Sequence, residues 1–316
     1  MSDAVAPIAP SRSSVTSEAV RRTLVGKRRG RGEWWFESIL LLSLLFGLAV
    51  LVTLMVQILG DGWSVLSDRG TNFLTSNLSS LPERAGVRQG LVGSLMLMGF
   101  VVVLAIPTGI AAALYMEEYA RDNRVTRFIN ANIRNLAGVP AIVYGILGLV
   151  IFQTRLNGIL GDRSLLTGGL TMSILVLPIV IITAAEAIRA VPTGIREAGY
   201  GVGATKWEVV RSHVLPYAAP GILTGSILTL SRAIGETAPL IMVGSVTGFL
   251  SISPGSFLET LQSQYTALPT IIYTWARRSQ VEFGNSTAAA IIVLMVVLLF
   301  INAVAILLRN RYDRKW

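Results

Sequence analysis

The sequence contains no cysteine and only one histidine, and charged side chains make up just 14% of its 316 residues. Without cysteine, the chain can form no disulfide and perform no thiol chemistry. A single histidine argues against a histidine-rich metal site, although carboxylate-rich sites stay open. Soluble domains carry about 25% charged residues, so the deficit excludes an ordinary water-exposed surface.

Apolar residues instead fill 52% of the chain, and the mean hydropathy is +0.61. A helix of about 20 apolar residues is long enough to cross the hydrocarbon core of a bilayer. The composition therefore predicts an all-α, polytopic membrane protein with six transmembrane helices. The six predicted spans are residues 38–58, 91–116, 133–152, 166–187, 218–243 and 287–308.

The chain is basic, with a net charge of +9 and an isoelectric point of about 10.3. Such a charge can indicate nucleic-acid binding, but in membrane proteins lysine and arginine gather in cytoplasmic loops. With the N-terminus inside, the predicted cytoplasmic segments hold eighteen basic residues and the outer segments hold seven. We therefore expect a multi-pass protein of the plasma (inner) membrane with both termini cytoplasmic, surrounded by lipid and without a nucleic-acid partner.

These patterns divide the chain into four parts. Residues 1–35 are a polar, basic N-terminal tail on the cytoplasmic side, and no signal-peptide cleavage site follows it. Residues 36–89 hold the first transmembrane helix and an outer loop. Residues 90–309 hold the other five spans, and residues 310–316 form a short cytoplasmic C-terminus.

Residues 190–216, between the fourth and fifth spans, predict two short helices around a glycine turn. The first helix begins at Pro192 and ends near Gly203, where glycine can adopt a positive φ. Thr205 and Glu208 have the spacing of a capping box, which begins the second helix. Leu215-Pro216 is expected to end that helix. The alternative is an amphipathic linker that only rests on the membrane.

Arg232 and Glu236 place a cation and an anion in an otherwise apolar run, "LTLSRAIGETAPL". Four residues apart, they share one face of a helix. Ionisable groups at bilayer depth are costly, and by default they mark a substrate path. Arginine binds oxyanions through two parallel hydrogen bonds and stays charged at any relevant pH. The alternative is an ion pair that only holds helices together.

Glu186 and Arg189 form a second predicted pair, three residues apart near the inner end of the fourth span. On the functional interpretation, they give an anion a second position on the same path. On the structural interpretation, Arg189 extends to the membrane surface beside a carboxylate on its own helix.

The 190–216 loop resembles the EAA loop of ABC importer permeases. Glu197-Ala198-Gly199 begins the pattern, Gly203 lies at the required distance, and Leu215-Pro216 closes it. Two positions depart from the pattern: Gly199 replaces an alanine and His213 replaces an isoleucine.

The resemblance implies that this loop is the coupling helix that contacts an ATP-hydrolysing subunit. Gly203 then forms the bend, and the contact is made by the segment Ala204, Thr205, Lys206, Trp207, Glu208 and Val209. The phosphate-binding pattern GxxxxGK[ST] is absent from the sequence. ATP-Mg is therefore expected on a partner subunit, and this chain is expected to be a transport subunit rather than an enzyme, with no cofactor or metal of its own.

Longer stretches are similar to one branch of these permeases, the PstA type of the phosphate-specific ABC importers. They include "GVPAIVYGILGL", "TALPTIIYTWA" and "RAIGETAPL", which contains Arg232. The resemblance implies an ABC importer permease (MetI-like) core at 90–309 and phosphate passage beside Arg232. It also implies a PstC-type second permease, two PstB-type nucleotide-binding ATPase subunits and an extracytoplasmic PstS-type phosphate-binding protein.

Two alternatives to phosphate import stay open. The first is an ABC permease for another oxyanion, such as sulfate or molybdate, or for an amino acid, since arginine alone does not separate these anions. The second is a membrane enzyme or pore that works without an ATPase. The spacing of the 190–216 loop argues against the second alternative.

Overall fold

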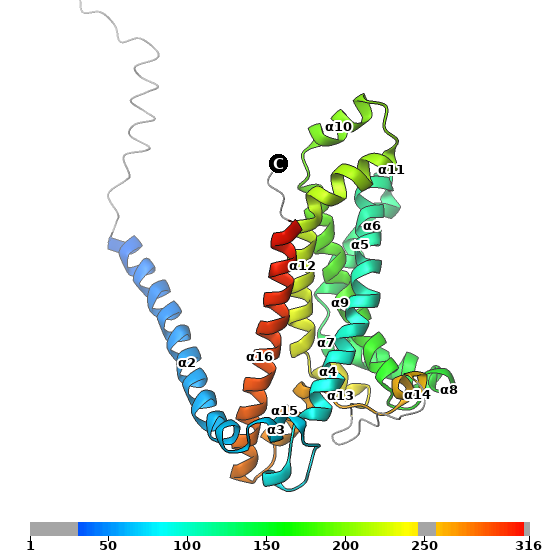
Figure 1. Ribbon diagram of the computed structural model, residues 1–316. Coiled ribbons are helices and arrows are strands. Elements are labelled where there is room, and N and C mark those ends of the chain that lie inside the picture. The colour runs from blue at the N-terminus through cyan, green and yellow to red at the C-terminus, as the bar shows by residue number, and fades with distance from the viewer. Residues whose placement is uncertain (1–30, 246–256, 313–316) are drawn as a thin grey trace, which may run out of the picture. The chain divides into compact units, whose positions relative to one another are not determined.

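The computed structural model describes residues 31–245 and 257–312, and within them it is helical (Figure 1). The described residues contain no strand, only one isolated bridge between Ser164 and Gln264. This confirms the predicted all-α class. The predicted N-terminal tail up to residue 30 and residues 313–316 of the C-terminus lie outside the described residues.

The α-helices, in chain order, are α2 (Arg31–Arg69), α3 (Thr71–Thr75), α4 (Arg88–Phe100), α5 (Ile106–Leu114), α6 (Arg124–Ala137), α7 (Ala141–Gly148), α8 (Asn157–Leu160), α9 (Leu165–Arg189), α10 (Thr193–Gly201), α11 (Lys206–Val209), α12 (Leu215–Gly235), α13 (Ala238–Met242), α14 (Phe257–Gln262), α15 (Leu268–Ala276) and α16 (Val281–Tyr312). One 3₁₀ turn, η1 (Pro82–Arg84), and four π-helical segments, η2 (Val101–Ala105), η3 (Tyr115–Tyr119), η4 (Leu149–Arg155) and η5 (Val210–Val214), connect or interrupt them.

The chain divides into two compact units, one ending at Gln57 and the other beginning at Ile58. The described part of the first unit is the N-terminal part of α2. That helix begins before the predicted first span and continues to Arg69, so it includes the start of the predicted outer loop. The predicted boundary between residues 89 and 90 stays a prediction. All features discussed below belong to the second unit.

Five helical segments are long and apolar enough to cross a membrane, and they overlap the predicted spans one, two, four, five and six. Their bounds are Trp34–Arg69, Arg88–Tyr119, Leu165–Arg189, Lys206–Gly235 and Val281–Arg311. The predicted third span is not one straight helix, because α6 and the α7–η4 segment meet at an angle of 100°. Pro140 explains this break: it donates no backbone hydrogen bond, and it disfavours helical geometry at the residue before it.

The segment from Lys206 to Gly235 is one continuous helix, so the prediction that Leu215-Pro216 ends a short helix is wrong. The π-helical segment η5 ends at Val214, two residues before Pro216. A π-turn shifts the hydrogen-bond register of a helix, and here the helix continues past a residue without an N–H. The same arrangement recurs at Pro107, which follows the π-helical segment η2.

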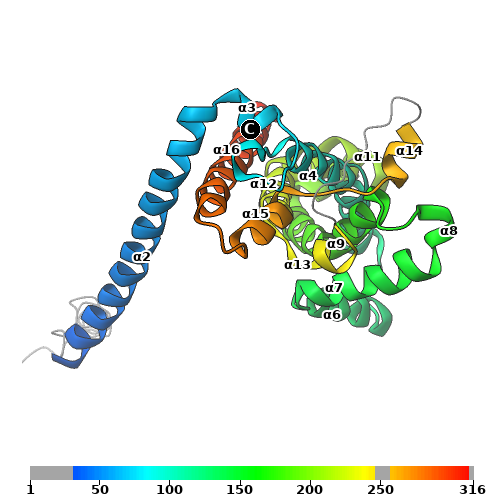
Figure 2. The same cartoon turned by 90° about the horizontal axis from the view of Figure 1, so that it is seen from below.

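Helix α9 lies among the other helices of the second unit and packs against α4, α5, α6, α7 and α12 (Figure 2). Glycines make this packing close. A Cβ atom on Gly168 would lie 2.4 Å from the Tyr265 hydroxyl, and one on Gly169 would lie 2.4 Å from the Phe100 ring. The bundle is therefore held by close helix contacts of the kind that small residues allow in membranes.

The two ends of the second unit differ (Figure 1). Helices α10 and α11 lie at one end, which we call the loop end. The short helices α8, α13, α14 and α15 lie at the opposite end. Helix α15 directly precedes α16 in the chain, and most of its side chains are buried. The sequence patterns did not predict α15 as a separate helix.

Candidate functional site

Arg232 and Glu236 lie in contact, as their spacing suggested. The Nε atom of Arg232 donates a hydrogen bond to Oε1 of Glu236 over 3.3 Å. The arginine side chain is 55% exposed and the glutamate side chain 21%. Within residues 31–245 and 257–312 this is the one hydrogen bond that the guanidinium makes. Its two terminal nitrogens are therefore free to bind another oxygen-bearing group.

The chain leaves the helix between these two charges. Helix α12 ends at Gly235, and Glu236 has an extended backbone with φ −79° and ψ 113°. The prediction that this span continues to residue 243 is therefore wrong. In a continued helix, the ring of Pro239 would clash with the carbonyl of Gly235, and Pro239 instead lies in the first turn of α13.

This helix end has an electrostatic effect on Arg232. The last carbonyl groups of a helix lack intrahelical donors and carry partial negative charge, which favours a cation in the last turn. Arg232 lies in the last turn of α12. Together with Glu236, the helix end holds a guanidinium in place within an apolar stretch.

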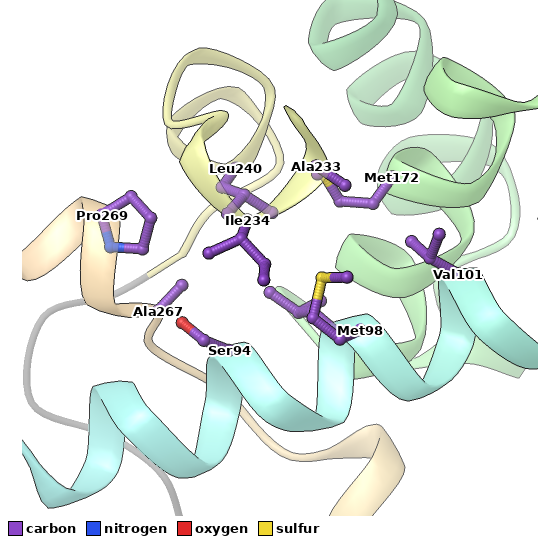
Figure 3. Close-up of a pocket in the computed structure, with 10 residues that line it drawn as sticks. Ser94, Met98, Val101, Met172, Ala233, Ile234, Leu240, Ala267 and Pro269 are labelled. Atoms are coloured by element: carbon purple, nitrogen blue, oxygen red, sulfur yellow. The ribbon is translucent and has the colours of Figure 1, made fainter. Parts of the chain in front are cut away.

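An apolar wall lies behind the ion pair. Ala233 and Ile234, which directly follow Arg232, point into a small cavity of about 10 Å³ (Figure 3). The cavity lies where α4, α9, α12, α13 and the start of α15 meet, and Ser94 is its one polar lining side chain. The Ser94 hydroxyl already accepts a hydrogen bond from the Leu268 amide over 2.8 Å. The interior side of α12 therefore offers no polar route at this level.

The opposite side of α12 is open. Leu228, Arg232 and Gly235 are exposed and follow one another at helical spacing. No described residue of this chain covers them, so this face meets lipid, a second chain or a water-filled path. Irregular backbone at membrane depth is tolerated where it is buried in protein or lines such a path, and the break at Glu236 is a feature of that kind.

The second predicted pair is arranged differently. Arg189 donates from Nε to Glu117 Oε2 over 3.2 Å, and its Nη2 also bonds the same carboxylate. Among the described residues no ion pair joins Arg189 to Glu186. Glu117 was not singled out from the sequence. The clue that could have identified it is the pair of adjacent glutamates at the end of an apolar span. Spacing along one helix cannot reveal this partner, because it comes from another segment.

The predicted helix-turn-helix of the 190–216 loop is confirmed. Helix α10 is followed by Gly203 with φ +83°, and α11 begins after Thr205. The capping box is complete: the Glu208 amide donates to the Thr205 hydroxyl, and Glu208 Oε2 accepts from the Thr205 amide over 2.7 Å. A positive φ favours glycine because a Cβ atom crowds the backbone there.

The two departures from the EAA pattern have local explanations. A Cβ atom on Gly199 would lie 2.8 Å from Cγ2 of Val209, so the glycine allows α10 to pack closely on α11. His213 is exposed on the π-helical segment η5, where no apolar side chain is needed.

The outer surface of this loop carries large apolar side chains. Val202 is 85% exposed and Trp207 53% exposed, and they lie on either side of the turn at Gly203. Of the other predicted contact residues, Thr205, Lys206 and Glu208 are also exposed and Ala204 is half-buried. Val209 is buried against Gly199 of α10, so its predicted place in the contact is wrong. Glu197 and Ala198, which begin the EAA pattern, are exposed. An exposed apolar group with a charged rim is typical of a protein-binding surface.

Neither region resembles a metal centre. Among the described residues no group of three or more histidine or acidic side chains could hold a metal ion. The α12 site instead presents the Arg232 guanidinium beside a carboxylate, and the loop end presents exposed apolar side chains beside charged ones.

Comparison with known proteins agrees with this arrangement. Residues 105–316 match the family described as "Binding-protein-dependent transport system inner membrane component". The chain is 33% identical to "Phosphate transport system permease protein PstA 1" of Mycobacterium tuberculosis, covering 84% of this chain and 85% of the relative. It is 29% identical to "Phosphate transport system permease protein PstC" of Mesorhizobium japonicum, covering 88% of each chain.

The fold is also that of a solved transporter. A crystal structure of a bacterial alginate ABC transporter, in complex with its periplasmic protein, matches 90% of this chain and 97% of its own with a TM-score of 0.63 and 16% identity. That likeness supports the ABC permease fold predicted from the loop and the helices. The chain is a multi-pass membrane transport component and belongs to the family of inner-membrane components of binding-protein-dependent transport systems.

Proposed function

We propose that this chain is the membrane-spanning permease subunit of an ATP-driven importer of inorganic phosphate. The observation that carries the proposal is Arg232, whose two terminal nitrogens have no hydrogen-bond partner in the described part of the chain and lie on an open helix face beside a break in the helix. Relatives whose names state phosphate transport cover most of the chain and support this substrate.

Arg232 and Glu236 would act together in the path. Glu236 holds the guanidinium while the path is empty, and phosphate takes over the guanidinium when it arrives. Phosphate at neutral pH carries a proton that a carboxylate can accept as a hydrogen bond, whereas sulfate carries none. A carboxylate beside the arginine therefore favours phosphate. Arg189, with Glu117 and Glu186 nearby, is the candidate for a second anion position at the loop end.

The partners follow from the family. We infer a complex of this chain with a PstC-type permease, two PstB-type ATPase subunits that bind ATP-Mg, and a PstS-type phosphate-binding protein outside the membrane. The open face of α12 would then meet the second permease, and the path would run between the two. The termini and the 190–216 loop lie in the set of segments that holds the excess of basic residues. This supports a cytoplasmic position for both termini and for the loop end.

The 190–216 loop would transmit ATP-driven movement, with Trp207 and Val202 as apolar contacts. Replacing Gly203 by proline should disrupt it, because proline fixes φ near −65° while the turn requires +83°. We expect phosphate uptake and transport-linked ATP hydrolysis to fall together, measured on the reconstituted complex. The control is Gly201→Ala, a helical position with no atom within 4 Å of the new Cβ. Normal uptake by an assembled Gly203→Pro complex would contradict this role.

Uptake of radiolabelled phosphate tests the substrate. Cells that lack this chain should lose high-affinity phosphate uptake and regain it when the chain is restored. A large excess of sulfate should leave the restored uptake unchanged, whereas arsenate, which carries the same kind of proton, should compete. If the deletion removes sulfate uptake and leaves phosphate uptake intact, the substrate is another oxyanion.

A further inference from the structure

Three consecutive residues at the end of the second membrane helix each contact a different element at the loop end. They are Glu117, Glu118 and Tyr119, and they lie in the π-helical segment η3. Glu117 binds Arg189 at the end of α9, Glu118 binds Arg196 on α10, and the Tyr119 ring lies under Lys206 of α11 at 5.0 Å. One short segment therefore joins the helix of α4 and α5 to both helices of the 190–216 loop.

The contact of Glu118 with Arg196 is the most enclosed of the three. The side chains are 6% and 20% exposed, and Oε1 of Glu118 accepts from Nε at 3.0 Å and from Nη2 at 2.9 Å. A charge pair of this kind is strongly directional, and removal of one partner leaves a buried charge without compensation.

Arg196 also binds the end of α9. Its Nη1 donates to the Val191 carbonyl over 2.7 Å, and its Nη2 donates to the Ile188 carbonyl over 2.9 Å. These carbonyls belong to the last turn of α9 and the residues just after it, where helices leave acceptors unsatisfied. A single side chain on α10 thus fixes the loop to the ends of two membrane helices.

The rest of α10 has few such attachments. Thr193, Gly194, Glu197 and Ala198 are exposed, and the helix touches the bundle mainly through Ile195 and through Gly199 against Val209. These apolar contacts resist separation but do not fix direction, since apolar contact is non-directional. A rotation of α10 would therefore reach the second membrane helix and α9 chiefly through three hydrogen bonds of Arg196, two to Glu118 and one to Ile188.

We propose that Arg196 and Glu118 are positioning residues that transmit movement of the 190–216 loop to the membrane helices. The inference rests on the proposed function of that loop. It predicts that breaking the pair lowers the amount of anion transported per ATP hydrolysed. Neither residue would contact the substrate or the ATPase.

The test uses the complete transporter reconstituted in vesicles, with phosphate uptake and ATP hydrolysis measured in the same sample. We expect Glu118→Gln and Arg196→Lys to lower phosphate transported per ATP by about tenfold, within the range usual for coupling between two sites. Lysine keeps the positive charge but lacks the planar guanidinium, which in Arg196 binds three acceptor oxygens at once. The control is Arg127→Ala, which removes an exposed ion pair with Asp122 and should leave the ratio unchanged.

A covalent bridge between positions 118 and 196 distinguishes a role in transmitting movement from a role in folding alone. The chain has no cysteine, so Glu118→Cys and Arg196→Cys introduce the only two thiols it contains. We expect the double variant to have a low ratio, and a short bifunctional thiol reagent to restore it without changing the amount of assembled complex. A normal ratio in Glu118→Gln and Arg196→Lys, or a bridge that restores nothing, would overturn the proposal.

The outcomes also distinguish this inference from the proposed function. If the wild-type complex transports sulfate instead of phosphate, the substrate is wrong, and the ratio is measured with sulfate in the same variants. If wild-type transport of phosphate is normal and the ratio does not respond to the pair, only the transmitting role fails.

Discussion

Replacement of Arg232 by alanine should lower phosphate uptake by about 100-fold while the complex still assembles. Each hydrogen bond from a guanidinium to an oxyanion contributes about 1.5–3 kcal/mol, and two such bonds account for a factor of this size. The side chain is exposed on one face of α12, and its hydrogen-bond and ion-pair partner among the described residues is Glu236, so its removal leaves the core intact. The measurement is radiolabelled uptake, with membrane levels of all subunits determined by blotting.

Two further variants sharpen this result. Arg232→Lys keeps the positive charge but not the planar fork, and it should recover only a small part of the uptake. Arg127→Ala, which removes an exposed ion pair on another helix, α6, is the control and should transport normally. Normal uptake in Arg232→Ala would mean that Arg232 and Glu236 only hold the end of α12, and phosphate passage would have to be sought elsewhere.

Replacement of Gly93 by alanine should remove most of the folded chain from the membrane. A Cβ atom at this position would lie 1.9 Å from the Thr266 carbonyl oxygen, so α4 and the segment before α15 must separate. The separation would also break the Ser94–Leu268 hydrogen bond of 2.8 Å. Overpacking of this kind costs about 3 kcal/mol when the obstacle is backbone. The measurement is the melting temperature of the purified chain in detergent, together with its membrane level.

Gly99→Ala is the matched control on the same helix. No atom lies within 4 Å of the new Cβ there, and alanine favours a helix over glycine by up to about 1 kcal/mol. We expect an unchanged or slightly higher melting temperature. Equal behaviour of the two variants would show that the contact between α4 and Thr266 is not tight in the membrane.

Local patterns in the sequence predicted much of this structure. The hydropathy of the spans gave five of six helices, because crossing lipid requires a long apolar run whatever its neighbours are. The turn at Gly203 and the capping box at Thr205 were also predictable, since each depends on residues that are near one another in the chain. The contact between Arg232 and Glu236 belongs to the same class.

Features that depend on distant residues were missed or predicted wrongly. The partner of Arg189 is Glu117, 72 residues away in the sequence, and the carboxylate that binds Arg196 comes from Glu118, 78 residues away. Proline gave ambiguous signals: Pro140 and Pro239 lie where one helix has ended and the next begins, whereas Pro107, Pro178, Pro216 and Pro220 lie within continuous helical segments. Pro107 and Pro216 follow π-helical segments, which a residue pattern does not reveal.

The unbroken helix from Lys206 to Gly235 has a mechanical consequence. Lys206 lies at the turn of the loop and Arg232 lies 26 residues further along the same helix, a path of about 39 Å along the helix axis at 1.5 Å per residue. Under the proposed function, this helix would connect the two sites through one unbroken backbone. A shift of about 3 Å, the length of one hydrogen bond, passed along it from the loop end would be enough to make or break the hold on an anion at Arg232.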